Sequence, residues 1–397
     1  MLLKCWELFR DRVTIPSCPY PNNFASDMMF IHYTNSLSAH QLPLDEEIVK
    51  RIGAENFRYV YTNEMLQGGA QEVRSDAPWI EQTDPASPRT RIMADLETCD
   101  WLLVGGLRPI GLMERRIAAG KATFYMSERW FKPLALFDLR LFDCLISVVL
   151  PGWLRLFHPR YFRMARRFAR LFNSPCYRYL PIGPWAAKDM RFVQGIMRFF
   201  GMRQDAAAEY LPWGDFVAPS CLPPREDLQT SPSSPLKVLS IGRLLKLKHV
   251  ETIVKAVGAV RSRPISLTIV GSGPEETALR KLTAGKTNIV MKPAVRLDEV
   301  RQVMRAHDVL VFASNATDGW GATVQEALTE GVPVLGTYEA GASAALLPEA
   351  QLFHCGDWRC LSRLLADFNS QTVLSQLPLD YSPKGAAERL IKEYRSI

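Results

Sequence analysis

One segment near residue 320 most limits the folds that this chain can adopt. The apolar run 309–314 predicts a buried parallel strand. It leads into Asp318-Gly-Trp-Gly-Ala-Thr-Val-Gln-Glu326, where two glycines allow a sharp turn and a close approach to a ligand. A helix over 322–330 and a further strand over 332–335 are predicted next. Strand, glycine turn, helix and strand in this order are typical of a doubly wound parallel α/β sheet.

The same turn combines an anion-binding geometry with two flanking carboxylates. Free N–H groups and the positive end of the helix dipole predict that Gly321, Ala322 and Thr323 bind a phosphate. Asp318 and Glu326 would repel a phosphate, so they must bind other groups. Sugar hydroxyls fit, because one carboxylate accepts two of them. A plain glycine turn with a surface Asp and a capped helix is the simpler alternative.

A second segment, which is basic, precedes the glycine turn in the sequence. Residues 237–248 predict a strand that ends at Gly242 and Arg243, with Lys248 at the start of the following helix. Arginine offers a planar fork and lysine a mobile charge, so together they would neutralise a diphosphate. Alone, they would be read as two exposed basic residues on a loop. Beside residues 318–326, they predict the leaving-group side of a catalytic site.

Strand–helix alternation continues through both halves of the chain. In the C-terminal half, strands are predicted at 265–270 and 288–293, and a helix at 297–307. In the N-terminal half, six strands are predicted at 30–35, 57–62, 101–105, 122–127, 145–150 and 177–182.

The alternation and a Pro/Ser-rich stretch predict four parts of the chain. The first is an N-terminal Rossmann-like domain, 1–215, that begins with an extension, 1–27. The Pro/Ser-rich stretch 216–235 is the predicted linker. A C-terminal Rossmann-like domain is expected over 236–382, and a last helix over 383–397.

Over roughly 140 residues, these C-terminal motifs resemble retaining GT-B glycosyltransferases of the family 4 type, also called glycosyl transferases group 1. That family usually has Glu and Gly-Phe-Gly where this chain has Asp318 and Gly-Trp-Gly, and Gly where it has His249. The resemblance implies two Rossmann-like domains facing a cleft, with the acceptor bound by the first, 1–215, and the nucleotide sugar by the second, 236–382. It further implies that the helix 383–397 crosses back to the first domain, that the donor is a nucleoside diphosphate sugar, and that the configuration is retained. It also implies that Glu326 holds the ribose hydroxyls and that the backbone near Val295 edges the base.

The acceptor side is expected in loops of the N-terminal half. His40 and Gln41 follow the first predicted strand, and Glu128 and Arg129 follow another, so both loops would face the cleft of a GT-B fold. Many family members have a His in the loop that here holds Glu128 and Arg129. In this chain, these two residues would instead contact the donor sugar or the acceptor. His40 is either a hydrogen-bonded loop residue or an active-site contact. His32, inside the first strand, is expected in the core.

Positive charge is concentrated in one region. The net charge is +7, yet residues 151–203 alone hold eleven Arg/Lys against one Asp. Within 153–173, a predicted helix places five arginines on one face and apolar side chains opposite. The arginines are Arg160, Arg163, Arg166, Arg167 and Arg170. The pattern predicts attachment to an anionic membrane surface, or a hold on the diphosphate of a lipid-linked acceptor. The alternative is a helix whose apolar side lies in the domain core.

The cysteines and the apolar runs indicate where in the cell the protein works. The eight cysteines form no Cys-x-x-Cys pair or metal spacing, which predicts reduced, mostly buried thiols in a cytoplasmic protein. No uncharged apolar run reaches the ~18 residues that span a bilayer, and charges interrupt the apolar part of the first 27 residues. We expect a cytoplasmic protein that is peripheral on the inner face of the cell membrane.

Together these features and the resemblance predict a metal-independent glycosyltransferase of the hexosyltransferase type, and the resemblance implies that it is retaining. It would move a sugar from a nucleoside diphosphate sugar to a glycan or lipid-linked glycan, in cell-surface polysaccharide synthesis. The chain has no Asp-x-Asp motif, so neither a metal nor another cofactor is expected. One alternative is a sugar-nucleotide epimerase of the same fold. The other is a non-enzymatic, basic protein that binds membranes or polyanions, although no nucleic-acid-binding motif is present.

Overall fold

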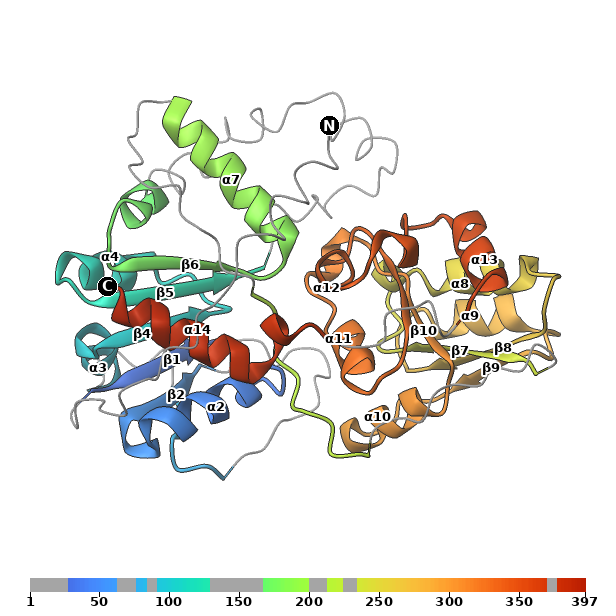
Figure 1. Cartoon of the computed structure of the whole chain (residues 1–397), viewed down its shortest axis with the longest axis horizontal. Coiled ribbons are helices and arrows are strands. Elements are labelled where there is room, and N and C mark those ends of the chain that lie inside the picture. The colour runs from blue at the N-terminus through green and yellow to red at the C-terminus, as the bar shows by residue number, and fades with distance from the viewer. Residues whose placement is uncertain are drawn as a thin grey trace.

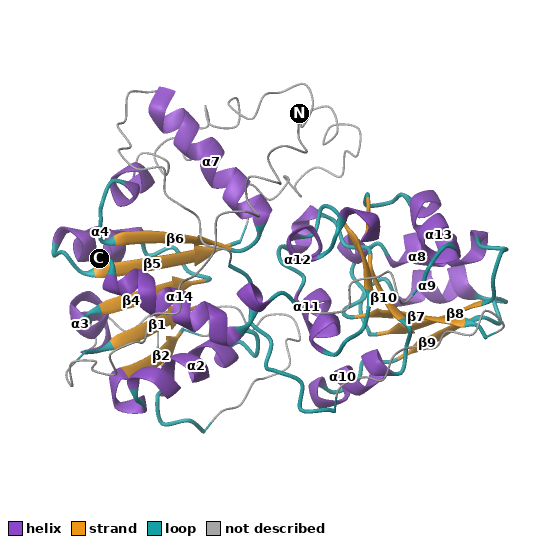
Figure 2. Ribbon diagram, in the orientation of Figure 1, coloured by secondary structure: helices purple, strands orange, loops and turns teal. Residues whose placement is uncertain are grey.

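Two parallel β-sheets, one from each half of the chain, form the framework of the protein. The computed structural model describes residues 28–62, 76–83, 91–128, 167–199, 213–223, 234–369 and 377–397. Each sheet has six strands. Helices flank both sheets, as Figure 1 and Figure 2 show. The predicted α/β class is therefore confirmed.

The N-terminal sheet has the strand order β3-β2-β1-β4-β5-β6, and all its strand pairs are parallel. Its strands are β1 (Phe30–Thr34), β2 (Phe57–Tyr61), β3 (Ile80–Gln82), β4 (Trp101–Gly105), β5 (Ala122–Ser127) and β6 (Tyr177–Pro181). The helices of this half are α2 (Leu42–Ile52), α3 (Arg91–Thr98), α4 (Ile110–Ala118) and α7 (Pro184–Phe199).

The C-terminal sheet repeats this plan with the order β12-β11-β10-β7-β8-β9. Its strands are β7 (Leu236–Ile241), β8 (Ile265–Val270), β9 (Ile289–Lys292), β10 (Val309–Phe312), β11 (Val334–Thr337) and β12 (Leu352–Phe353). Its helices are α8 (Val250–Ala259), α9 (Glu276–Thr283), α10 (Leu297–Arg305), α11 (Ala322–Thr329), α12 (Gly341–Leu346) and α13 (Trp358–Ala366).

Both sheets are buried on both faces, which explains their unbroken apolar strands. Neighbouring residues on a strand point to opposite faces. In β1, Phe30 and Ile31 accordingly belong to two different core clusters, and both are 0% exposed. In β10, Leu310 and Val311 divide in the same way. Burial on both sides therefore selects the continuous Val/Leu/Phe runs seen in the sequence.

The chain crosses between the two units twice. The first crossing joins β6–α7 to β7: Phe216 is fully buried in the N-terminal core, whereas the Ala218 carbonyl accepts a 2.6 Å bond from Arg301 of α10. Glu330, whose side chain is 0% exposed, holds Arg301 at 3.1 Å and accepts from the Ser220 hydroxyl at 2.8 Å. This crossing is thus fastened to the C-terminal unit from Ala218 onward.

The second crossing ends in the last helix, α14 (Pro383–Arg395). Leu390 of α14 is buried in the same cluster as Phe30 and Trp101 of the N-terminal sheet. The Tyr394 ring lies 4.5 Å from the Trp101 ring, and Glu393 pairs with Arg178 at 3.1 Å. Figure 1 shows α14 lying along the N-terminal sheet.

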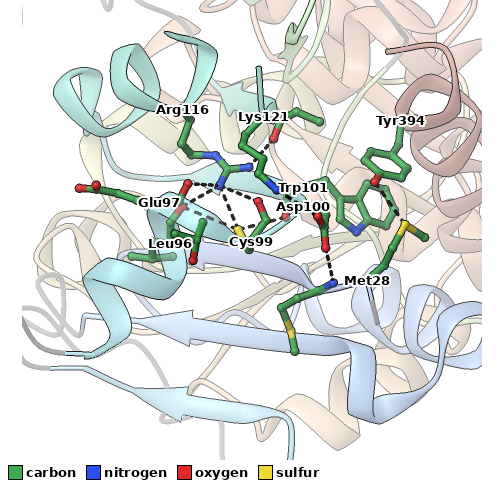
Figure 3. Close-up of polar contacts among 12 residues, drawn as sticks. Met28, Leu96, Glu97, Cys99, Asp100, Trp101, Arg116, Lys121 and Tyr394 are labelled. Atoms are coloured by element: carbon green, nitrogen blue, oxygen red, sulfur yellow. Dashed lines mark hydrogen bonds and ion pairs between the residues drawn. The ribbon is translucent and has the colours of Figure 1, made fainter. Parts of the chain in front are cut away.

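A buried arginine holds together the segments in which β4 and β5 of that sheet begin. Arg116 is 0% exposed and donates to the carbonyl oxygens of Leu96, Cys99 and Ala122 at 2.8, 3.0 and 2.7 Å (Figure 3). Asp100 beside it accepts from the Lys121 ammonium at 3.2 Å. Burial lowers the pKa of the Arg116 guanidinium and raises the pKa of the Cys99 thiol to about 11. Cys99 is therefore a protonated structural thiol at neutral pH.

Several expectations can be compared with these elements. Five of the six strands predicted in the N-terminal half are present, and the run 145–150 lies outside the described residues. The sequence did not reveal β3 or β12, which have only 3 and 2 residues and lie at sheet edges. The expectation of mostly buried thiols is wrong for the described cysteines: Cys99 alone is buried, and Cys221 is exposed.

The predicted basic helix is described only from residue 167 onward. Residues 167–172 are helical, and Phe168 and Leu171 are fully buried in the N-terminal core. Arg167 pairs with Glu114 at 2.5 Å, and Arg170 is exposed. At this end of the segment the apolar side lies in the domain core, as the alternative interpretation expected. In the described part of the chain, no helix is long and apolar enough to cross a membrane.

Candidate active site

The glycine turn after β10 forms the centre of the site. Asn315 caps a short 3-10 turn, Ala316–Asp318, by accepting a hydrogen bond from the Thr317 amide at 2.9 Å. Gly319 and Gly321 follow with φ of 75° and 90°, a region that favours glycine, and α11 starts at Ala322. The N-terminus of α11 is therefore presented at the carboxyl end of a central strand, where α/β sheets bind ligands.

Two predicted site residues form an ion pair beside this turn. Lys248 closes the 3-10 turn that follows β7, and its Nζ lies 2.6 Å from Asp318 Oδ2. The ammonium also lies 5.0 Å from the centre of the Phe312 ring. The two side chains are only 20% and 14% exposed. Arg243, which follows Gly242, is exposed, so it can turn toward an anion at low cost.

His249 takes a backbone conformation that usually requires glycine. Its φ is 47°, and among the described residues it is the one non-glycine residue with positive φ. The imidazole lies between Glu251 Oε1, at 3.1 Å, and Asn315 Nδ2, at 3.2 Å. These contacts connect the start of α8 to the capped turn before Asp318. They explain how this chain keeps the left-handed geometry with a histidine.

Residues of the N-terminal half reach the same place. His40 Nε2 lies 3.0 Å from Glu326 Oε1, a contact between residues 286 positions apart. Gln41 donates to Asp215 Oδ1 at 3.0 Å, and the Phe216 amide donates to the His40 carbonyl at 2.7 Å. The loop after β1 thus meets the first crossing and α11 together. His32, by contrast, lies in the core, where it was expected.

Glu128 lies over the glycine turn. Its Oε1 accepts a long hydrogen bond, 3.4 Å, from the Trp320 amide. A Cβ at Gly319 would lie 2.3 Å from the same oxygen, so a side chain there would displace the Glu128 carboxylate, and the positive φ already favours glycine. A carboxylate of the N-terminal half therefore faces the backbone donors of the C-terminal half. Arg129 lies outside the described residues.

Trp320 is fixed between the two crossings of the chain. It is 1% exposed, stacks on Tyr381 with ring centres 5.7 Å apart, and donates from Nε1 to Gln325 Oε1 at 3.1 Å. A Cβ at Gly214 would lie 2.5 Å from the Trp320 ring. Glycine at 214 thus makes room for a tryptophan, which is larger than the phenylalanine that the family usually has.

The N-terminal residues of the site have shifted proton affinities. Burial raises the pKa of Asp215 to about 6; His40 and Gln41 oppose that rise, and the nearby Glu128 adds to it. For His40, burial lowers the pKa, but the hydrogen bond to Glu326 and the charges of Asp215 and Glu326 together raise it above its ordinary value. The two groups consequently hold protons at a pH at which free Asp and His would release them.

The remaining predicted residues lie on α11 and in the loop after β9. Ala322 and Thr323 are the first two residues of α11. Val295 lies in the loop between β9 and α10 and packs partly against the C-terminal core. Among the described residues, no three His, Cys, Asp or Glu side chains gather as they would around a metal ion.

Comparisons with known proteins identify the C-terminal half. Residues 235–359 match the family described as glycosyl transferases group 1. The chain carries a group 1 glycosyltransferase domain. All four predicted catalytic residues, Arg243, Lys248, Asp318 and Glu326, fall inside the matched range, whereas His40, Glu128 and Asp215 fall outside it.

A curated relative and two solved structures extend this finding. Over 107 residues the chain is 33% identical to the UDP-N-acetylglucosamine–peptide N-acetylglucosaminyltransferase GtfA subunit of Streptococcus pneumoniae, covering 26% of this chain and 20% of that protein. The lipopolysaccharide outer core galactosyltransferase WaaB has a TM-score of 0.59 at 12% identity, over 92% of this chain and 100% of the other. Anabaena HepE in complex with UDP has a TM-score of 0.56 at 13% identity, over 93% and 98%. These likenesses show the GT-B fold.

Two residues of this site were not predicted. Asp215 follows a glycine and directly precedes the Pro/Ser-rich stretch, and this position next to the crossing could have marked it. Trp320 lies within the glycine motif, but its packing against Gly214 and Tyr381 joins segments far apart in the sequence. Only the folded chain brings these groups around the turn of the group 1 domain.

The raised pKa values predict a pH-dependent stability. A group whose pKa is higher in the folded chain binds protons more tightly there, so its contribution to stability is lost as pH rises. For Asp215 this loss falls between its ordinary pKa of 3.8 and about 6, and His40 acts in the same direction. We expect the thermal midpoint to fall from pH about 4 to about 7, and less steeply in Asp215→Asn. Equal slopes for both proteins would contradict this assignment.

Proposed function

We propose that this protein is a retaining, metal-independent glycosyltransferase that moves a hexose from a nucleoside diphosphate sugar to a glycan hydroxyl. The observation that carries the proposal is the grouping of Lys248, Asp318 and Glu326 around the N-terminus of α11. It supplies a cation and free amides for a diphosphate, and two carboxylates for hydroxyls. Exposed Arg243 adds a second cation at the carboxyl end of β7.

In the proposed mechanism, donor contacts replace the present pairs. The diphosphate binds Lys248 and replaces Asp318 as its partner. The ribose hydroxyls bind Glu326 and replace His40 as its partner. Asp318 then accepts hydrogen bonds from hydroxyls of the donor sugar. As the bond between the anomeric carbon and the diphosphate oxygen breaks, negative charge grows on the leaving phosphate, where the cations and the helix N-terminus stabilise it. The acceptor hydroxyl attacks from the same face and gives its proton to the leaving phosphate oxygen, so the configuration is retained.

Uridine is the base to test first. HepE, which shares the fold, was crystallised with UDP, and the pneumococcal relative is named for a UDP-sugar. A ligand that binds the native state raises thermal stability according to its concentration and affinity. In a thermal-shift screen of nucleoside diphosphates and their sugars, we expect UDP and one UDP-sugar to raise the midpoint. A flat response to every nucleotide would refute donor binding.

Two other activities can be separated from transfer by experiment. An epimerase of this fold would isomerise its sugar nucleotide without any acceptor, whereas the proposed transferase would leave the sugar unchanged. A basic binding module would show salt-sensitive binding to polyanions and no response to nucleotides. The contacts of His40 with Glu326 of α11 and of Glu128 with the glycine turn favour the transferase, because they bring a second surface to the donor site.

We further propose that the acceptor is a lipid-linked glycan and that the arginine-rich segment binds an anionic membrane. A cation near such a surface contributes about 1 kcal/mol at low salt. The protein should therefore sediment with anionic liposomes and dissociate as salt rises. Exposed Arg170 is part of the described end of this face. Changing Arg160, Arg163, Arg167 and Arg170 to Gln should abolish sedimentation, and equal binding to neutral liposomes would contradict the electrostatic argument.

A further inference from the structure

An aromatic pair lies where the two halves meet, and the donor site makes no use of it. Trp185 stands in the first turn of α7, just after β6, and Tyr338 directly follows β11. Trp185 Nε1 donates to the Tyr338 carbonyl at 3.0 Å, and the two rings meet edge to face with centres 4.9 Å apart. Both residues thus stand at carboxyl ends of parallel strands, the edge at which such sheets bind ligands.

Tyr338 of this pair is exposed, Trp185 is half-buried, and polar side chains surround both. Tyr338 is 45% exposed, and the His354 ring lies 5.8 Å from it. Glu339 Oε1 holds His354 Nδ1 at 3.0 Å, and Lys188 Nζ lies 5.4 Å from the Trp185 ring centre. Aromatic rings cover apolar surface, while the rim offers donors and an acceptor. A sugar ring has the matching chemistry, with C–H groups on its faces and hydroxyls around its edge.

The pair is also close to the glycine turn. The Gly341 amide donates to the Gly319 carbonyl at 3.0 Å, and the Ala342 amide donates to the Trp320 carbonyl at 2.7 Å. Gly341 is three positions after Tyr338, and an extended chain spans about 3.5 Å per residue. Tyr338 therefore lies within about 11 Å of the segment that contacts the turn. A glycan chain could occupy both places at once.

We propose that Trp185 and Tyr338 form a subsite that binds one sugar residue of the acceptor glycan by stacking. The sugar lies some units away from the hydroxyl that is glycosylated, so the pair selects for an oligosaccharide rather than a single sugar. This inference rests on the proposed transferase function. It gives the acceptor a contact from each half of the protein, since Trp185 belongs to the N-terminal unit and Tyr338 to the C-terminal one.

Packing between the halves is the competing explanation. A contact that only joins two units would be expected to bury its rings, yet almost half of Tyr338 remains exposed. The hydrogen bond from Trp185 uses the Tyr338 backbone, so it leaves the phenol ring available. The test must separate loss of sugar binding from loosening of this joint.

The experiment measures binding to an array of defined oligosaccharides, with UDP affinity by calorimetry as a second readout. We expect the full-length protein to bind a subset of the glycans. Tyr338→Ser and Trp185→Leu should weaken that binding about tenfold or more, as expected for the loss of one stacked ring. Tyr338→Phe keeps the ring and should stay within about twofold. The matched control is Trp358→Leu on α13, a tryptophan that also has a cation, Arg359, over its ring at 4.6 Å.

The outcomes separate the two proposals. Absence of glycan binding, or unchanged binding in Tyr338→Ser and Trp185→Leu, would overturn the subsite. Equal losses of UDP affinity, thermal stability and glycan binding in these variants would also overturn it and indicate a packing role. If the wild-type protein bound glycans through this pair but bound no nucleotide, the subsite would stand and the proposed donor function would fail.

Discussion

Lys248→Ala is expected to lower turnover by roughly two to three orders of magnitude, the usual cost of removing a group that stabilises developing charge. The ammonium is partly buried beside Asp318, where its interaction with a leaving phosphate is strong. Because the effect belongs to the transition state, kcat should fall much more than donor affinity. Arg243→Ala should have a smaller effect, since the side chain is exposed. Steady-state kinetics with the donor found in the nucleotide screen would measure both.

Lys246→Ala provides the control for Lys248. It removes an exposed lysine of the same 3-10 turn, two residues earlier, and should leave kcat nearly unchanged. Because the proposed mechanism holds the diphosphate with side chains and backbone, a chelator should not alter the rate. Activity that disappears with chelator and returns with magnesium would contradict the metal-independent mechanism.

Glu326→Gln is expected to weaken nucleotide binding by about tenfold to a hundredfold, the range for hydrogen bonds to a charged group. The amide replaces a carboxylate that can accept from both ribose hydroxyls. The effect should be specific to the ribose: affinity for UDP falls, and affinity for pyrophosphate does not. Calorimetry with the two ligands would test this, and unchanged UDP affinity would remove Glu326 from the donor site.

His40→Ala is the matched comparison for Glu326→Gln. It leaves the carboxylate intact and removes its present partner, which lies 3.0 Å away. If the ribose must displace His40, UDP affinity should rise in this variant. A loss of affinity equal to that of Glu326→Gln would show instead that the histidine itself holds the nucleotide.

The sequence predicted the local parts of the site and missed the contacts between distant parts. Lys248, Asp318 and Glu326 each follow a strand–turn–helix signal, so parallel strands with known edges were enough to bring them together. The pairing of His40 with Glu326 depends on how two sheets face each other, which no local pattern encodes.

The prediction of buried thiols was wrong, and the two short strands were not predicted, for related reasons. Burial of a cysteine depends on which neighbours cover it, and Cys221 lies exposed on the crossing between the units. Strands of two or three residues at a sheet edge, such as β12, are fixed by their partner strand rather than by their own sequence.

The two crossings also determine how the halves can move. Phe216 belongs to one core and Ala218 is bonded to the other unit, so the first passage takes two residues. At the second, Tyr381 receives a bond from Gln325, and α14 begins two residues later. Trp320 touches both passages. Two such short connections, both in contact with Trp320, would restrict one unit to rotation relative to the other about the line that joins them. They would oppose sliding of one unit along the other. A rotation that parts the two units would break the contact between His40 and Glu326, and the short connections would keep these residues opposite each other.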